Sequence, residues 1–103
     1  MKFKNMFSPI QIGPMTVKNR FVVPPMGNNF ANSDGTWSDE SVAYYGERAK
    51  GQFGLITIEA TVVHKGAKGG PKKPCLYDDN SIESLKKITD ACHEAVSYTH
   101  LRA

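Results

Sequence analysis

The chain has 103 residues, of which 40% are hydrophobic and 10% aromatic, and its formal net charge is +3. This composition is ordinary for a globular interior and excludes a disordered chain, and the length allows one small domain or a piece of a larger one. The excess of positive charge lies largely in residues 65–73 and is too small to indicate nucleic-acid binding.

The cysteine content and the start of the chain indicate the compartment. Cys75 and Cys92 form neither a CxxC pair nor a disulfide framework, so reduced thiols are expected. The start, MKFKNMFSPIQIG, has no apolar segment and no small-residue cleavage site of a signal peptide, and no stretch approaches transmembrane length. Neither His64 nor His93 has a partner at metal-ligand spacing. We therefore expect a cytoplasmic protein with no metal site and no membrane partner.

In chain order, the first predicted element is a small hairpin. Apolar and polar residues alternate on both sides of Gly13–Pro14, a dipeptide typical of turns. The apolar run RFVVP at 20–24 then predicts a first strand, covered on both faces like a strand of a parallel sheet. Residues 28–37, NNFANSDGTW, are rich in Asn, Asp, Gly and Ser and predict a loop.

A helix is predicted next, from Ser38 to Gly51. Ser38 is a favoured N-cap, two acidic residues follow it in the first turn, and Gly51 is a natural terminator. The residues that recur at helical spacing and are expected on its buried side are Val42, Tyr45 and Ala49. FGLITIEA at 53–60 then predicts a second buried strand.

The last predicted elements are a long loop and a second helix. Residues 61–77 are rich in Gly, Lys and Pro and show no apolar period. Asp79 or a neighbouring residue is expected to cap the helix that follows. The residues expected on the buried side of this helix are Ile82, Leu85, Ile88, Ala91 or Cys92, and Ala95.

The order hairpin, strand, helix, strand, helix predicts an α/β fold with a parallel sheet. The two strands begin about 30 residues apart, which suits a right-handed βαβ unit. Two parallel strands leave open edges and bare apolar faces, and they have no independent stability. We therefore expect further βα units beyond residue 103.

The last residues break the helical pattern. VSYTHLRA at 96–103 brings Val, Tyr and Thr together without a glycine, a cap or a strand pattern. It resembles the translated read-through of a sequencing adapter that recurs at the ends of incomplete gene models. We therefore predict that residues 97–103 are not native sequence; the alternative is a frayed helical tail.

Two longer stretches carry a resemblance to a known family. MFSPIQIGPMTVKNRFVVPPMGNNFANSDG at 6–35 and YYGERAKGQFGLITIEATVVHKGAKG at 44–69 are similar, in the same order, to the amino-terminal part of the Old Yellow Enzyme family. The branch that they resemble comprises the NADH:flavin oxidoreductases, 2,4-dienoyl-CoA reductases and enoate reductases. The resemblance implies that residues 5–96 are the amino-terminal portion of a (β/α)8 TIM barrel, incomplete in this chain, that binds FMN at the carboxyl ends of its strands. The hairpin would close the bottom of that barrel.

The resemblance assigns the flavin site to two strand ends. Pro24, Pro25, Met26 and Gly27, at the end of the first strand, would cradle the flavin, and Ala60 would let it lie against the second strand. The chemistry suits these residues, because prolines keep a segment rigid, a thioether packs softly on a ring and glycine allows close approach. Gly27 departs from the threonine or cysteine of many relatives. Without the resemblance, the same residues indicate a strand terminated by Pro-Pro and a small residue at the sheet edge.

Two other features have both a structural and a functional interpretation. Glu59 is expected near the barrel interior, as a polar residue with a structural rather than a catalytic role. The loop VHKGAKGGPKKP at 63–74 lacks the spacing of a phosphate-binding P-loop. We expect a solvated loop at the barrel rim; the alternative is contact with a phosphate of CoA or NAD(P)H.

The resemblance implies an FMN-dependent oxidoreductase in which NAD(P)H passes hydride through FMN N5 to the β-carbon of an activated alkene. The substrate would be an enone, an enoate or an enoyl-CoA, and an iron–sulfur cluster and FAD could lie in a later part of the protein. The groups that grip the substrate lie later in such barrels, so no catalytic residue is assigned here and the chain alone is expected to be inactive. Two alternatives stay open: a small self-contained βαβ binding or structural protein, and another TIM-barrel enzyme.

Overall fold

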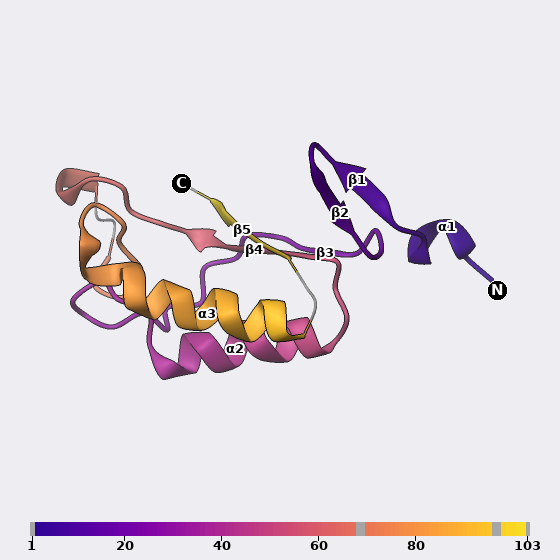
Figure 1. Cartoon of the computed structure of the whole chain (residues 1–103). Helices are drawn as coiled ribbons and strands as arrows, with labels where there is room; N and C mark the ends of the chain where they lie inside the picture. The colour runs from indigo at the N-terminus through magenta and orange to yellow at the C-terminus, as the bar shows by residue number, and fades with distance from the viewer. Residues whose placement is uncertain (1, 68–69, 96–97, 103) are drawn as a thin grey trace.

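The structure, a computed structural model, describes residues 2–67, 70–95 and 98–102, the last segment by its backbone (Figure 1). The chain runs from a short helix and a hairpin into alternating parallel strands and helices. The helices are α1 (Lys4–Phe7), α2 (Asp39–Lys50) and α3 (Ile82–Glu94), with 3-10 turns at Lys65–Ala67 and Asp79–Ser81. The strands are β1 (Ile10–Ile12), β2 (Met15–Val17), β3 (Val22–Val23), β4 (Leu55–Ala60) and β5 (Tyr98–Arg102).

β3, β4 and β5 form a parallel sheet in that order. Val22 and Val23 pair with Leu55 and Ile56, and Leu55 also pairs with Tyr98 of β5. α2 and α3 pack against each other along one face of the sheet (Figure 1). None of the helices in the described parts of the chain is long and apolar enough to cross a bilayer. The predicted α/β fold with parallel strands, including the βαβ unit β3–α2–β4, is therefore confirmed.

The predicted hairpin is formed by β1 and β2. Its strands pair antiparallel, with Ile10 opposite Val17 and Ile12 opposite Met15. Gly13 occupies the turn with a φ of +58°, a left-handed conformation that glycine adopts without a steric penalty. The hairpin lies away from the two long helices (Figure 1), and its Ile10 and Ile12 side chains are exposed.

The core lies between β4 and the two long helices. Ile56 and Ile58 of β4 are fully buried in one apolar cluster with residues of α2 and α3. The other buried members of the cluster are Val23, Trp37, Tyr45, Ala49, Ile88 and Cys92. The buried sides predicted for the helices are thus confirmed, except that Ile82 is 57% exposed. Ile82 lies six residues before Ile88. At about 100° per residue, this separation places Ile82 about 120° around the helix from the buried Ile88.

A side-chain cap begins α2, as predicted, and another begins the 3-10 turn before α3, whose own N-cap residue, Ser81, makes no side-chain capping bond. The Ser38 hydroxyl accepts a hydrogen bond from Ser41 N at 3.1 Å at the start of α2. Before α3, the cap is the neighbour of Asp79: the Asp78 side chain accepts a hydrogen bond from Asn80 N at 3.0 Å and begins the 3-10 turn that leads into the helix. Both caps satisfy main-chain donors that a helix start leaves without a partner.

Replacing Ser38 with alanine is expected to cost about 1 kcal/mol of folding stability. The hydroxyl caps α2 and also donates a hydrogen bond to the Phe30 carbonyl oxygen at 2.5 Å. Thermal denaturation of the Ser38→Ala and Ser38→Thr variants of the complete protein measures the effect, because threonine keeps the hydroxyl. Equal melting temperatures for Ser38→Ala and the wild type would argue against the capping role.

Asn19 joins the starts of β3 and β4. Its Oδ1 accepts hydrogen bonds from Phe21 N at 3.0 Å and Gly54 N at 2.9 Å, and its Nδ2 donates to the Gln52 carbonyl oxygen at 2.7 Å. Asn19 is 8% exposed. One buried amide therefore satisfies three main-chain groups at the amino ends of two neighbouring strands, which fixes the start of the sheet.

Residues 98–102 form a strand, although the sequence shows no strand pattern there. β5 pairs in parallel with β4, whose edge offers main-chain groups for pairing. Residues 98–102 therefore do not form the frayed helical tail that was the alternative interpretation. Residues 97 and 103 lie outside the described residues, and the non-native origin of 97–103 stays a prediction.

Candidate functional site

The chain leaves the sheet directly after Val23. Residues 24–29, which we call the rim segment, belong to no strand or helix, so the two prolines interrupt no ladder. Met26 is 49% exposed, and Gly27 is exposed as well. Within the described residues, the main-chain N–H groups of Met26 and Gly27 have no hydrogen-bond partner. The rim segment therefore offers two unused donors at the carboxyl end of β3.

Ala60 ends β4 beside the rim segment. The pairing of β3 with β4 ends at Val23 and Ile56, and farther along Asn28 N lies 3.5 Å from Glu59 Oε2, so the rim segment stays close to the end of β4. Ala60, like Gly27, is exposed and adds almost no side chain to this edge. The residues predicted to contact a flavin thus lie together, at the carboxyl ends of two neighbouring parallel strands. Their contact with a flavin stays a prediction.

Glu59, next to this edge, is 1% exposed. Its carboxylate accepts hydrogen bonds from Tyr45 Oη at 3.1 Å and from Asn28 N at 3.5 Å, and its own N–H donates to Tyr45 Oη at 3.1 Å. A bulge in the pairing with β5, between Ile58 and Ala60, breaks the alternation of the strand. The buried, hydrogen-bonded position of Glu59 agrees with the structural role that the sequence predicted for it. Glu59 lies buried against α2 and ties β4 to the rim segment.

Burial raises the pKa of Glu59 above its ordinary value of 4.5. Hydrogen bonds from Tyr45 and Asn28, the indole N–H of Trp37 and the positive charge of Lys73 act in the opposite direction on this pKa. The Trp37 N–H is buried and makes no hydrogen bond of regular geometry within the described residues, although it lies near Glu59. Burial also raises the pKa of the Tyr45 hydroxyl. The carboxyl of Glu59 therefore holds its proton more tightly in the folded protein than in the unfolded chain.

This raised pKa predicts how stability changes with pH. The contribution of the Glu59 proton is fully present below pH 4.5 and is lost as the pH rises through the raised pKa of the folded state. The Glu59→Gln variant has no such proton, so we expect its stability relative to the wild type to increase as the pH is raised. Urea unfolding of both complete proteins from about pH 4 to about pH 7 measures the difference. A difference that does not change with pH would refute the expectation.

The loop after β4 returns to the rim segment. Val62 pairs with Cys75, and Cys75 N donates a hydrogen bond to the Gly35 carbonyl oxygen at 2.8 Å. This path brings Lys73 Nζ to 3.4 Å from the position that a Cβ on Gly27 would occupy. Sequence reasoning missed this neighbour of the predicted site, because the contact joins residues that are far apart in the chain.

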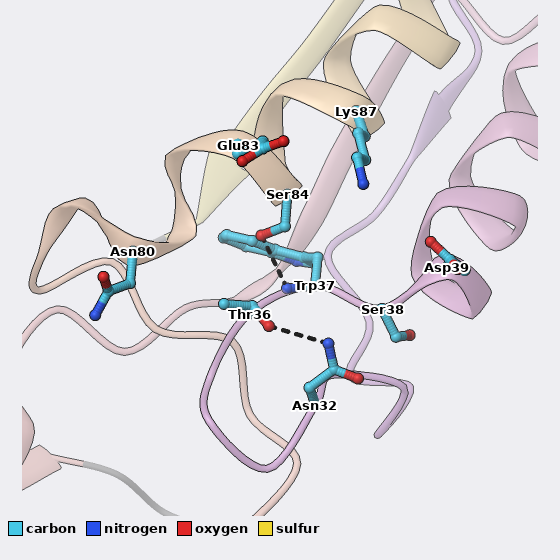
Figure 2. A pocket seen from close by; sticks show the side chains of 9 residues that line it. All are labelled: Asn32, Thr36, Trp37, Ser38, Asp39, Asn80, Glu83, Ser84 and Lys87. Carbon is cyan, nitrogen blue, oxygen red and sulfur yellow. Dashed lines mark hydrogen bonds between the residues drawn. The ribbon is translucent and has the colours of Figure 1, made fainter.

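A separate hollow of about 390 Å³ lies between the loop before α2 and the start of α3 (Figure 2). Ser84 Oγ accepts a hydrogen bond from Trp37 N at 3.1 Å, and Asn32 Nδ2 donates to Thr36 Oγ1 at 3.0 Å. The other residues that line the hollow are Ser38, Asp39, Asn80, Glu83 and Lys87. Neither here nor elsewhere in the described chain do three His, Cys, Asp or Glu residues gather as a metal site. Several polar groups that line the hollow are hydrogen-bonded to one another. The rim segment, in contrast, has main-chain donors without a partner among the described residues, so it is the stronger candidate site.

Parallel strands joined by helices define the class, an α/β protein, and in such folds ligands bind at the carboxyl ends of the strands. Within this class, residues 5–102 match the model of the NADH:flavin oxidoreductase / NADH oxidase family. The match covers nearly the whole chain, and the chain belongs to this family.

Solved structures of the same kind superpose closely on the chain. The Old Yellow Enzyme from Pichia sp. AKU4542 is 33% identical, with a TM-score of 0.88 over 94% of this chain and 25% of that one. The old yellow enzyme from Trypanosoma cruzi is 34% identical, with a TM-score of 0.88 over 98% of this chain and 27% of that one. A 2-naphthoyl-CoA reductase in complex with 2-naphthoyl-CoA is 30% identical, with a TM-score of 0.92; the match covers 96% of this chain and 15% of that one.

The chain therefore spans about a quarter, or less, of the length of these relatives. This share, together with the superposition, confirms the predicted fold class, an incomplete part of a (β/α)8 barrel.

Proposed function

We propose that the protein to which this chain belongs is an FMN-dependent oxidoreductase that oxidises NAD(P)H. The observation that carries the proposal is the edge formed by the rim segment and Ala60: among the described residues the N–H groups of Met26 and Gly27 have no partner, and Gly27 and Ala60 are small and exposed. A flavin ring is flat, and its pyrimidine edge both donates and accepts hydrogen bonds, so it suits an edge that has available donors and small side chains. Membership of the NADH:flavin oxidoreductase / NADH oxidase family supports the same cofactor.

Each residue of this edge has a separate part in the proposed function. Pro24 and Pro25 hold the main chain rigid, so the N–H groups of Met26 and Gly27 are oriented before the cofactor binds. The Met26 thioether offers a polarisable contact to a ring. Gly27 and Ala60 leave the space that a ring needs to approach the strand ends. When bound, FMN supplies the hydride chemistry, whereas the protein supplies orientation and electrostatics.

We further propose that the substrate is an activated C=C bond in an enone, an enoate or an enoyl-CoA, as in 2,4-dienoyl-CoA and enoate reductases. One similar structure, 2-naphthoyl-CoA reductase with 2-naphthoyl-CoA, supports a CoA thioester substrate by the ligand that it holds. Morphinone reductase, which is 28% identical to the chain, was solved with tetrahydroNAD and supports the use of NAD(P)H. A cytoplasmic location belongs to the same proposal. An iron–sulfur cluster and FAD in a later part of the protein stay predictions.

Expression of the complete gene tests the proposal. The purified protein is expected to be yellow, to release FMN when it is denatured, and to oxidise NADH or NADPH faster when an enone, an enoate or an enoyl-CoA is added. A folded protein that stays colourless after incubation with FMN would rule out the cofactor. A flavoprotein that reduces none of the three substrate types would rule out only the substrate class. The 103-residue chain alone is proposed to be inactive and to bind FMN weakly.

A further inference from the structure

We propose that Lys73 gives the flavin site a fixed positive charge beside Gly27, which favours the reduced form of the bound flavin. The inference rests on the proposed function and adds to it a residue from outside the two strand ends. Its geometric basis is the distance of 3.4 Å between Lys73 Nζ and the position of a Cβ on Gly27. The ammonium group therefore lies within contact distance of the point where a side chain at position 27 would begin.

The packing of the loop holds Lys73 in this place. Lys73 is half-buried, and the next residue, Pro74, is fully buried and accepts a hydrogen bond from Val62 N at 2.8 Å. The aliphatic stem of Lys73 passes close to Gly70, where a Cβ would lie 3.8 Å from Lys73 Cγ and 3.9 Å from Lys73 Cε. The main chain at Lys73 is therefore anchored through Pro74, and the stem runs past Gly70 toward Gly27.

The neighbouring acidic group leaves the charge of Lys73 available. Lys73 attracts Glu59 electrostatically, but the Glu59 carboxylate is buried and already accepts hydrogen bonds from Tyr45 and Asn28. Within the described residues, no salt bridge includes Lys73. The ammonium lies next to the exposed Gly27, so a ligand at the rim segment would meet its charge directly.

The chemistry of flavins gives this charge a consequence. Reduction by two electrons and one proton converts the neutral ring into an anion, so a nearby cation favours the reduced form over the oxidised form. Charge close to the ring is one of the means by which a protein tunes a flavin. A charge at a partly buried position is also screened less by salt than a charge on the open surface.

The midpoint potential of the bound flavin in the complete protein tests the inference. In the Lys73→Gln variant, we expect the preference for reduced over oxidised FMN to fall about tenfold, which lowers the potential by about 30 mV for a two-electron couple. Lys73→Arg keeps the charge and is expected to keep the wild-type potential. Lys72→Gln is the matched control, because Lys72 is the exposed neighbour in the same loop. Anaerobic titration against a reference dye measures all four proteins.

The possible outcomes separate this inference from the function on which it rests. An unchanged potential in Lys73→Gln, or an equal shift in Lys72→Gln, would overturn the role of Lys73 and leave the flavin function intact. A complete protein that binds no flavin would overturn both. A lower midpoint potential in Lys73→Gln, but not in Lys73→Arg or Lys72→Gln, supports the inference. Loss of a purely structural contact would not depend on whether the substituted side chain keeps the positive charge.

Discussion

Replacing Gly54 with alanine is expected to destabilise the complete protein by about 3 kcal/mol. A Cβ at position 54 would lie 2.6 Å from the main-chain oxygen of Asn19 and 2.8 Å from Asn19 Oδ1. Neither oxygen moves away cheaply, because the Asn19 side chain binds Phe21 N and Gly54 N at the same time. The added methyl group would therefore separate the start of β3 from the start of β4. Since a native protein is stable by only about 5–15 kcal/mol, the expected loss is a large share.

Gly46→Ala is the matched control for this prediction. Gly46 lies inside α2, and a Cβ there would meet Ala91 Cβ at 3.8 Å, an ordinary contact. Alanine is a better helix former than glycine by about 1 kcal/mol, so this variant is expected to be more stable than the wild type. Urea unfolding of the three proteins compares them. If Gly54→Ala unfolded at the same urea concentration as the wild type, the hydrogen bonds of Asn19 would not be what holds the strand starts together.

The order of the elements could be predicted from the sequence because each boundary has a local cause. Gly13 makes its turn through a left-handed φ, and Ser38 begins α2 through a hydrogen bond to a residue three positions later. Gly51 ends the same helix. Such signals depend on near neighbours in the chain, and a single sequence contains them. The prolines that follow β3 marked the rim segment in the same way, since proline cannot donate to a ladder.

The parts that sequence reasoning missed depend on contacts between distant residues. Glu59 is hydrogen-bonded to Tyr45 of α2, and no alternation of residue types in β4 shows that contact. Lys73 reaches Gly27 only because its loop folds back along β4. Asn19 joins the starts of β3 and β4, which are separated in the sequence by the whole of α2. Periodicity assigns residues to elements, whereas these positions are set by how the elements meet.

Replacing Ala60 with leucine is expected to weaken FMN binding to the complete protein by about 100-fold, which corresponds to about 2.7 kcal/mol. Ala60 is the last residue of β4, and it is exposed near the rim segment, where its side chain adds only a methyl group to the edge. A leucine would occupy the space that a planar ring needs to lie against the end of β4. Titration of the apoprotein with FMN, followed by the fluorescence of the flavin, gives the two dissociation constants.

Ala43→Leu controls for the added bulk, because Ala43 is exposed on α2, away from the rim segment. This variant is expected to bind FMN like the wild type. Both variants are expected to melt as apoproteins at nearly the wild-type temperature, since surface substitutions usually change stability by no more than about 0.5 kcal/mol. A loss of affinity in Ala60→Leu alone therefore reflects the cofactor site rather than unfolding. Wild-type affinity in Ala60→Leu would mean that the flavin does not lie against the end of β4, and it would remove Ala60 from the proposed site.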